Sequence, residues 1–179
     1  MHASCIFLTG QPGVGKTTII RQIVRELANN GKRLGGMISS EIRESGERIG
    51  FEIEDIATGK SGMLAQKEMR VGAPTVGKYH VNIADIERIG VTAIRNAIRE
   101  ADVVIVDEVG PMELKSEQFI LAVEDAIASR KNFVGTVHKG SVHSLIRIVR
   151  NANCKIIDVN LRNRNLIAPE IVNELTRAA

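Results

Sequence analysis

Aromatic side chains are scarce in this sequence: among 179 residues there are four phenylalanines, one tyrosine and no tryptophan. Proteins that bind single-stranded nucleic acid stack bases on aromatic side chains along a basic groove. Here the formal net charge is only +3, and the basic residues are scattered in short groups such as "REL", "KRL" and "RKN". We therefore expect ordinary solvated surface charge and no nucleic acid as a main ligand.

Long apolar runs and a cysteine framework are absent as well. No stretch approaches the roughly 18 apolar residues of a membrane-spanning helix. The first ten residues, "MHASCIFLTG", carry no basic segment ahead of a short apolar run, so we expect no signal peptide. Two cysteines, Cys5 and Cys154, make a disulfide framework unexpected. The sequence predicts a cytosolic, reduced protein without a membrane partner; its oligomeric state stays open, with a monomer slightly favoured.

The pattern of apolar segments predicts an α/β fold. With 44% hydrophobic residues and no linker, repeat or low-complexity segment, residues 1–179 are expected to form one domain. Continuous apolar runs alternate with segments of helical periodicity, which indicates a mainly parallel sheet with helices on both faces. The segments 32–44 and 48–56 read as an added antiparallel hairpin, at an edge or beside the site.

The expected elements can be given by residue range. Strands are predicted at 4–9, 103–108, 132–138 and 155–160 in addition to the hairpin, and loops with short strands at 57–82. Helices are predicted at 16–27, from Asn82 to Ala101, at 116–129 and at 141–151. A last helix is expected to be entered through Pro169, because proline suits a first helical position.

A glycine-rich loop separates the first predicted strand from the first predicted helix. It fits G-x-x-x-x-G-K-[ST] in the strand–loop–helix context that this phosphate-binding motif, the P-loop, requires. Glycines let successive N–H groups point inward, and the helix N-terminus adds donors and partial positive charge. Lys16 is predicted to reach the β- and γ-phosphates, and Thr17 to present its hydroxyl to Mg²⁺. The loop therefore predicts a nucleotide polyphosphate site formed by Gly10, Gln11, Pro12, Gly13, Val14, Gly15, Lys16, Thr17 and Thr18.

A buried strand that ends in two acids supplies the second half of the predicted site. In "VVIVDEVG" the strand ends at Asp107 and Glu108, and the carboxyl ends of parallel strands lie where ligands bind in open α/β folds. Asp107 is placed to complete the Mg²⁺ shell with Thr17. Glu108 is placed to orient and partly deprotonate a water that attacks the γ-phosphate. The alternative for both acids is a solvated strand end.

Missing motifs narrow the choice of reaction. "DEVG" fits the D-x-x-G of a GTPase switch, but the guanine-binding N-K-x-D occurs nowhere, and no arginine-rich lid of a small-molecule kinase is evident. Water is then the simplest acceptor, which favours a nucleoside-triphosphate hydrolase. Phosphoryl transfer to another acceptor, by a nucleotide or small-molecule kinase, stays open, as does a nucleotide-dependent switch.

At these residues the sequence resembles the small nucleoside-triphosphatases of archaea and thermophilic bacteria, whose human relative is called the cancer-related nucleoside-triphosphatase. The resemblance covers nearly the whole chain and is carried by "LTGQPGVGKTT", "EIRESGERIGF" and "DEVGPMEL", with Val109 where isoleucine is commoner. It implies a Mg²⁺-dependent phosphohydrolase that acts on ATP, GTP, CTP and UTP with weak base preference. It also implies two nucleotide-binding segments, residues 10–17 and the stretch Val103, Val104, Ile105, Val106, Asp107, Glu108, Val109 and Gly110.

Five further residues are weaker candidates. Arg43 and Arg48 lie on the predicted hairpin, where one could act in cis as an arginine finger on the γ-phosphate. A solvated hairpin surface is the competing interpretation. Asn163 and Arg164 could pack on the base or ribose, or belong to the surface. His138 could reach the γ-phosphate region or serve as a cap.

Overall fold

The computed structural model describes residues 3–68, 71–138 and 154–177. Within them nine strands form one sheet in the order β5-β6-β4-β3-β2-β7-β8-β1-β9. The strands are β1 Cys5–Gly10, β2 Leu34–Glu44, β3 Glu47–Asp55, β4 Ser61–Gln66, β5 Thr75–Val76, β6 Tyr79–Val81, β7 Val103–Val109, β8 Asn132–Val137 and β9 Lys155–Val159. The helices are α1 Lys16–Asn29, α2 Ile83–Asp85, the π-helical η1 Ile86–Val91, α3 Thr92–Glu100, the 3₁₀ turn η2 Glu113–Lys115, α4 Glu117–Ala128 and α6 Arg164–Arg177.

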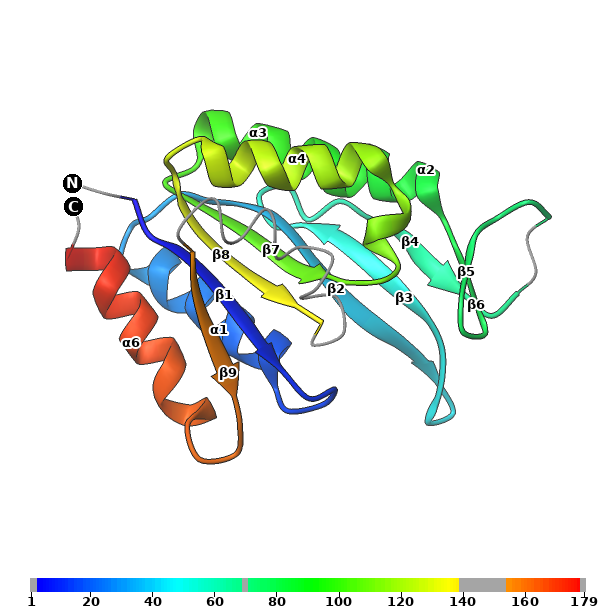
Figure 1. Cartoon of the computed structure of the whole chain (residues 1–179), viewed down its shortest axis with the longest axis horizontal. Helices are drawn as coiled ribbons and strands as arrows, with labels where there is room; N and C mark the ends of the chain where they lie inside the picture. Colours follow the sequence, from blue (N-terminus) through cyan, green and yellow to red (C-terminus); the bar gives the residue numbers. More distant parts are fainter. Residues whose placement is uncertain (1–2, 69–70, 139–153, 178–179) are drawn as a thin grey trace.

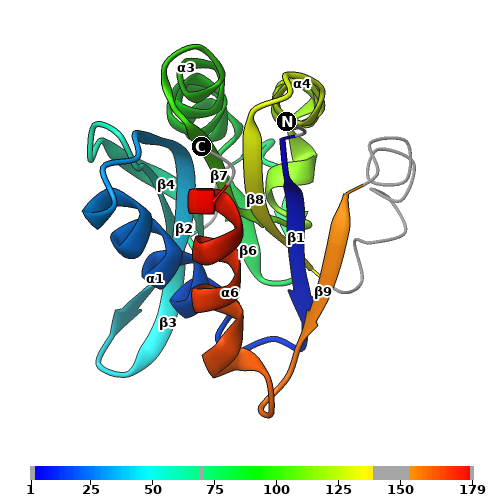
Figure 2. The same ribbon diagram turned by 90° about the vertical axis from the view of Figure 1, so that its left-hand side faces the viewer.

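Helices cover both faces of the sheet, as the sequence predicts. Helices α1 and α6 lie on one face and α3 and α4 on the other (Figures 1 and 2). In β7 the alternation of side chains assigns Val103 and Ile105 to the core under α1 and α6, and Val104 and Val106 to the core under α3 and α4. A strand buried on both faces must be apolar at every position, which accounts for the uninterrupted run in the sequence. In the part of the chain that the structure describes, no helix is long and apolar enough to cross a membrane.

The hairpin β2–β3 lies inside the sheet, and the alternative that it forms an edge is wrong. β2 runs parallel to β7 on one side and antiparallel to β3 on the other. Beyond β3 the sheet continues through β4, β6 and β5, which come from the segment 57–82. The segment 57–82 thus forms short strands, as the sequence predicts, and these strands cover the edge of β3 that would otherwise be exposed.

Of two predicted helix starts, the one at Asn82 is confirmed and the one at Pro169 is wrong. Asn82 caps the helical segment after it, where its side chain accepts a hydrogen bond from the Asp85 N–H, so the predicted start is confirmed. Pro169 does not open the last helix: α6 begins at Arg164 and contains the proline. Burial of Ile167 and Ile171 against the sheet outweighs the backbone hydrogen bond that proline cannot donate. The predicted helix 141–151 lies outside the described residues.

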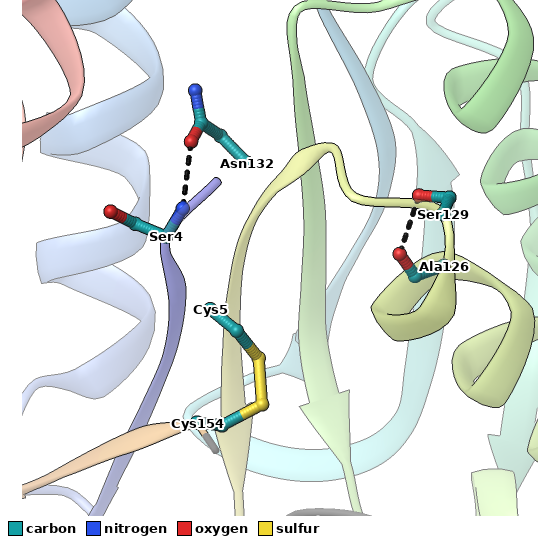
Figure 3. Close-up of a disulfide and its surroundings, with 6 residues drawn as sticks. All are labelled: Ser4, Cys5, Ala126, Ser129, Asn132 and Cys154. Atoms are coloured by element: carbon teal, nitrogen blue, oxygen red, sulfur yellow. Dashed lines mark hydrogen bonds between the residues drawn. A yellow bond between two sulfur atoms is a disulfide. The ribbon is translucent and has the colours of Figure 1, made fainter. Parts of the chain in front are cut away.

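The expectation of reduced cysteines is also wrong for this structure. Cys5, at the start of β1, and Cys154, directly before β9, form a disulfide with their Cα atoms 4.7 Å apart (Figure 3). β1 and β9 are parallel neighbours in which Ile6 lies opposite Lys155, so the register also brings the two preceding residues together. Two cysteines cannot build a framework, but a single bond between adjacent strands requires only this register.

Candidate functional site

The glycine-rich loop joins β1 to α1 at the carboxyl edge of the sheet. Gly10 has φ +147°, and a Cβ there would lie 2.7 Å from the carbonyl oxygen of Val159. Gly15, directly before the helix, has φ +107°, a conformation that side chains disfavour. The loop therefore requires glycine at both ends. Lys16 is only 7% exposed, and its ammonium donates to the Gly10 carbonyl at 3.3 Å, so it is held inside the loop.

Asp107 ends the apolar part of β7 on the same face as α1. Its carboxylate is fully buried; one oxygen accepts a hydrogen bond from the Thr136 hydroxyl, and Oδ2 has no hydrogen-bond partner. Burial raises the pKa of Asp107 to about 6, against the opposite influence of the adjacent Thr136 and Thr17 hydroxyls. A buried carboxylate with an unused oxygen beside a threonine hydroxyl fits a Mg²⁺ ion, which would offset the cost of burying the negative charge.

The described residues contain no cluster of three or more acidic, histidine or cysteine side chains that could hold a metal ion. A closed protein cage for a metal ion is therefore not present among these residues. Mg²⁺ in nucleotide sites is held by one or two side chains together with substrate phosphates and water. Thr17 and Asp107 are the two side chains that would hold such an ion.

A cleft of about 450 Å³ opens above the glycine-rich loop. It brings together Lys16 and Glu108, the two residues for which the sequence predicts direct roles at the γ-phosphate. Glu108 is half-buried, so its carboxylate stays accessible to a ligand and to water. The full lining is Gly13, Gly15, Lys16, Thr17, Thr18, Ser39, Ser40, Glu41, Arg43, Phe51 and Glu108.

A second cavity, of about 340 Å³, adjoins the cleft on the side of α3 and α4. It shares Lys16, Ser39, Glu41, Phe51 and Glu108 with the cleft. Residues 37 and 53 belong to the core on that side, so the alternation along β2 and β3 turns Ser39, Glu41 and Phe51 toward it. Its other lining residues are Pro12, Arg48, Leu64, Val76, Gly110, Pro111, Met112, Glu113 and His138.

Both candidate arginines are tied to one carboxylate. Arg43 Nη2 and Arg48 Nη1 each lie 2.6 Å from a different oxygen of Glu41. The hydrogen bond from Arg48, followed by that from Arg43, lowers the pKa of Glu41 although its partial burial acts in the opposite direction. Arg43 lines the cleft and Arg48 the second cavity. The structure therefore brings both arginines to the site, on opposite sides of Glu41.

Several other predicted residues do not line the cleft. Val103, Val104, Ile105 and Val106 are fully buried within the sheet, where they position Asp107. Asn163 shapes the turn before α6: its Oδ1 accepts from the Asn160 N–H, and its Nδ2 donates to the Asp158 carbonyl. Arg164 is the exposed first residue of α6. His138 lines the second cavity together with Glu108.

Sequence reasoning missed two residues at this site. Thr136 is a polar residue that interrupts the apolar run 133–137 of β8, next to β7, and this interruption could have indicated a partner for Asp107. Glu113 is 4% exposed, and its Oε2 accepts from the Gly110 N–H at 3.2 Å. Burial, with smaller contributions from Glu108 and Asp107, raises the pKa of Glu113 to about 8. No local pattern in the sequence indicates that this acid is buried.

Comparison with known proteins agrees with this geometry. Residues 5–172 match a family model described as NTPase. A nucleoside-triphosphatase THEP1 from Thermofilum pendens is 41% identical over 177 residues, which cover 98% of this chain and 97% of the relative. The crystal structure of THEP1 from Aquifex aeolicus matches with a TM-score of 0.83 at 34% identity, covering 95% of this chain and 98% of that one. The solution structure of a human cancer-related nucleoside triphosphatase matches with a TM-score of 0.84 at 33% identity, covering 99% and 100%.

Proposed function

The chain belongs to the NTPase family of nucleoside-triphosphatases, and we propose that it hydrolyses the γ-phosphate of ATP, GTP, CTP and UTP with weak base preference and with Mg²⁺. The observation that carries this proposal is the shared cleft of Lys16 and Glu108, with the unpartnered Asp107 oxygen beneath it. Since nucleoside triphosphates are cytoplasmic metabolites, we propose a cytoplasmic location as well.

Each step of hydrolysis has a candidate side chain. Lys16 and the N–H groups of the loop bind the β- and γ-phosphates. Thr17 and Asp107 would hold Mg²⁺, which supplies charge neutralisation at the phosphate oxygens when bound. Glu108 accepts a hydrogen bond from the attacking water, orients it toward the γ-phosphorus and takes its proton. The diphosphate is the leaving group.

Weak base preference follows from where the binding energy arises. The glycine-rich loop, Lys16 and Thr17 all address phosphates, which the four nucleotides share. Asn163 uses both ends of its amide to hold its own turn, so it is committed to shaping the loop. In this proposal, a contact of Asn163 or Arg164 with the ribose or base would add only a minor part of the binding energy, most of which comes from the phosphates.

The two acids give the sharpest test. Asp107→Asn removes a charge from the Mg²⁺ shell, so we expect weaker Mg²⁺-dependent binding of the triphosphate. Glu108→Gln keeps size and hydrogen bonding but cannot take a proton, so we expect unimpaired binding and hydrolysis lower by roughly 10²- to 10⁴-fold. Affinity for a non-hydrolysable triphosphate and single-turnover hydrolysis should be measured on the same preparations.

A matched control is Glu54→Gln, which neutralises a half-buried carboxylate of β3 that is not part of the cleft lining. It is expected to hydrolyse at the wild-type rate. Phosphate release across the four triphosphates and their diphosphates, with and without Mg²⁺, tests the substrate range. If the Glu108→Gln protein hydrolyses at the same rate as the Glu54→Gln protein, Glu108 is not the general base.

A further inference from the structure

The second cavity has the size and position of a small-molecule site. Its volume of about 340 Å³ lies at the lower end of the range for ligand pockets, roughly 300–1,000 Å³. This suits one ring system with a small polar appendage rather than a second triphosphate. Because Lys16 and Glu108 line both the cavity and the cleft, a ligand here would lie next to the γ-phosphate.

The walls of the cavity are apolar and partly aromatic. Phe51 is held from two directions: Tyr79 packs against it edge-on with ring centroids 5.1 Å apart, and the Arg48 guanidinium lies 5.1 Å from its ring centre. Arg48 is itself fixed by the Tyr79 hydroxyl at 2.9 Å. A preorganised aromatic wall favours a planar ligand, since little side-chain entropy is lost on binding. The apolar lining comprises Phe51, Leu64, Val76, Pro111 and Met112.

The charges of the lining favour a neutral ligand. Of the two strong cations, Lys16 is committed to the phosphates, and Arg48 is paired with Glu41 at 2.6 Å. Glu113 lines the cavity from a nearly dry position, and burial raises the pKa of its carboxyl to about 8, which favours the protonated form. A neutral carboxyl donates and accepts hydrogen bonds, as hydroxyl and ring nitrogen groups require.

We propose that this cavity binds a neutral, hydroxyl-bearing heterocycle of the nucleoside class, and that the ligand's hydroxyl replaces water as acceptor of the γ-phosphate. The inference rests on the proposed function in one respect: it takes the triphosphate bound in the cleft as the phosphoryl donor. The hydroxyl oxygen forms a bond to the γ-phosphorus while the bond from phosphorus to the β–γ bridging oxygen breaks. The nucleoside diphosphate leaves with that electron pair, and the hydroxyl proton passes to Glu108. The products are a nucleoside monophosphate and a nucleoside diphosphate.

The test follows labelled phosphate in the full-length protein. The protein is incubated with Mg²⁺ and γ-³²P-labelled ATP, with adenosine, guanosine, cytidine or uridine at millimolar concentration. Inorganic phosphate and phosphorylated nucleoside are separated by chromatography. Ribose at the same concentration is the control ligand, because it carries hydroxyls without a heterocycle. We expect labelled monophosphate from at least one nucleoside and none from ribose.

Two variants assign any product to the cavity. Val76→Trp places an indole at a half-buried lining position of β5 and should lower monophosphate formation at least tenfold while phosphate release persists. Thr75→Trp adds the same bulk at the exposed preceding residue and should leave both products at wild-type levels.

The outcomes separate the two proposals. Phosphate release without labelled monophosphate overturns the acceptor site and leaves hydrolysis standing. Equal monophosphate yields from the wild type and Val76→Trp place the acceptor elsewhere and also overturn it. Absence of phosphate release without nucleoside contradicts the proposed hydrolysis, and monophosphate formation in the same protein then still supports the acceptor site.

Discussion

The buried carboxyl of Glu113 predicts a measurable dependence of stability on pH. The side chain is 4% exposed, and burial raises its pKa to about 8 from the ordinary value of 4.5. Below pH 4.5 the group is protonated in both the folded and the unfolded chain. Between the two values the folded chain keeps a proton that the unfolded chain releases. The free energy of unfolding therefore falls as pH rises through this window and levels off above pH 8.

The size of the effect follows from the two pKa values. At about 1.36 kcal/mol for each pH unit between them, the loss reaches roughly 5 kcal/mol for a fully buried carboxyl. Such a change is comparable to the whole stability of many domains, about 5–15 kcal/mol. Glu113→Gln is the neutral counterpart: its amide oxygen can still accept from the Gly110 N–H, but it has no proton to release. We expect this variant to be the more stable protein above pH 8.

The assay is urea denaturation between pH 4 and 9 in the absence of nucleotide and Mg²⁺. Glu100→Gln, which removes an exposed carboxylate at the end of α3, is the control and should follow the wild-type profile. Asp107, whose pKa is raised to about 6, contributes its own slope below that value, but equally in all three proteins. The difference between Glu113→Gln and wild type thus isolates Glu113. Parallel profiles for these two proteins would refute the reasoning.

Four other substitutions have defined outcomes. Lys16→Ala should weaken triphosphate binding and nearly abolish hydrolysis with unchanged circular dichroism; near-normal turnover would remove the loop lysine from the mechanism. Arg43→Ala or Arg48→Ala should lower kcat far more than nucleotide affinity if that arginine meets charge that develops late, whereas equal losses in rate and affinity would indicate a ground-state contact. Cys5→Ser should lower the free energy of unfolding by about 2–4 kcal/mol under oxidising conditions, as reduction of the wild type should. Denaturation with and without reductant measures this, and two titratable thiols in the untreated wild type would contradict the bond.

The parts of the fold that could be predicted were those with a local signature. The strand of Val103–Val106 is apolar at every position because both faces are buried, and the helix from Asn82 carries its cap in its first residue. Pro169 was misplaced because the rule for proline at helix starts is a preference, which the burial of α6 overrides. The Cys5–Cys154 bond depends on the register of two strands far apart in sequence, which no local pattern records.

The candidate site also contains parts with a local sequence signature and parts without one. The glycine-rich loop and the strand that ends in two acids could be located from the sequence, because each has a local signature of residue types at fixed spacing. The cavity formed by Phe51, Leu64 and Met112 could not, because its walls come from separate elements whose apolar residues look like ordinary core. Glu113 escaped notice since an acid in a turn is normally solvated.

The charged residues Glu41, Arg43 and Arg48 of the β2–β3 hairpin do not belong to the core. The alternation of side chains along the strands places them at the candidate site. The sheet turns Glu41 toward the gap between the cleft and the second cavity, and each of its oxygens holds one arginine. Arg43 is 56% exposed, so its ion pair with Glu41 costs little to break, whereas Arg48 is also held by the Tyr79 hydroxyl. In the proposed mechanism, a γ-phosphate in the cleft would compete with Glu41 for Arg43, and charge on the transferring group would shift the competition toward the phosphate. A finger held by such a weak pair would contribute more to the transition state than to the bound substrate, so a loss of kcat without a loss of affinity would distinguish a finger from a surface charge at this hairpin.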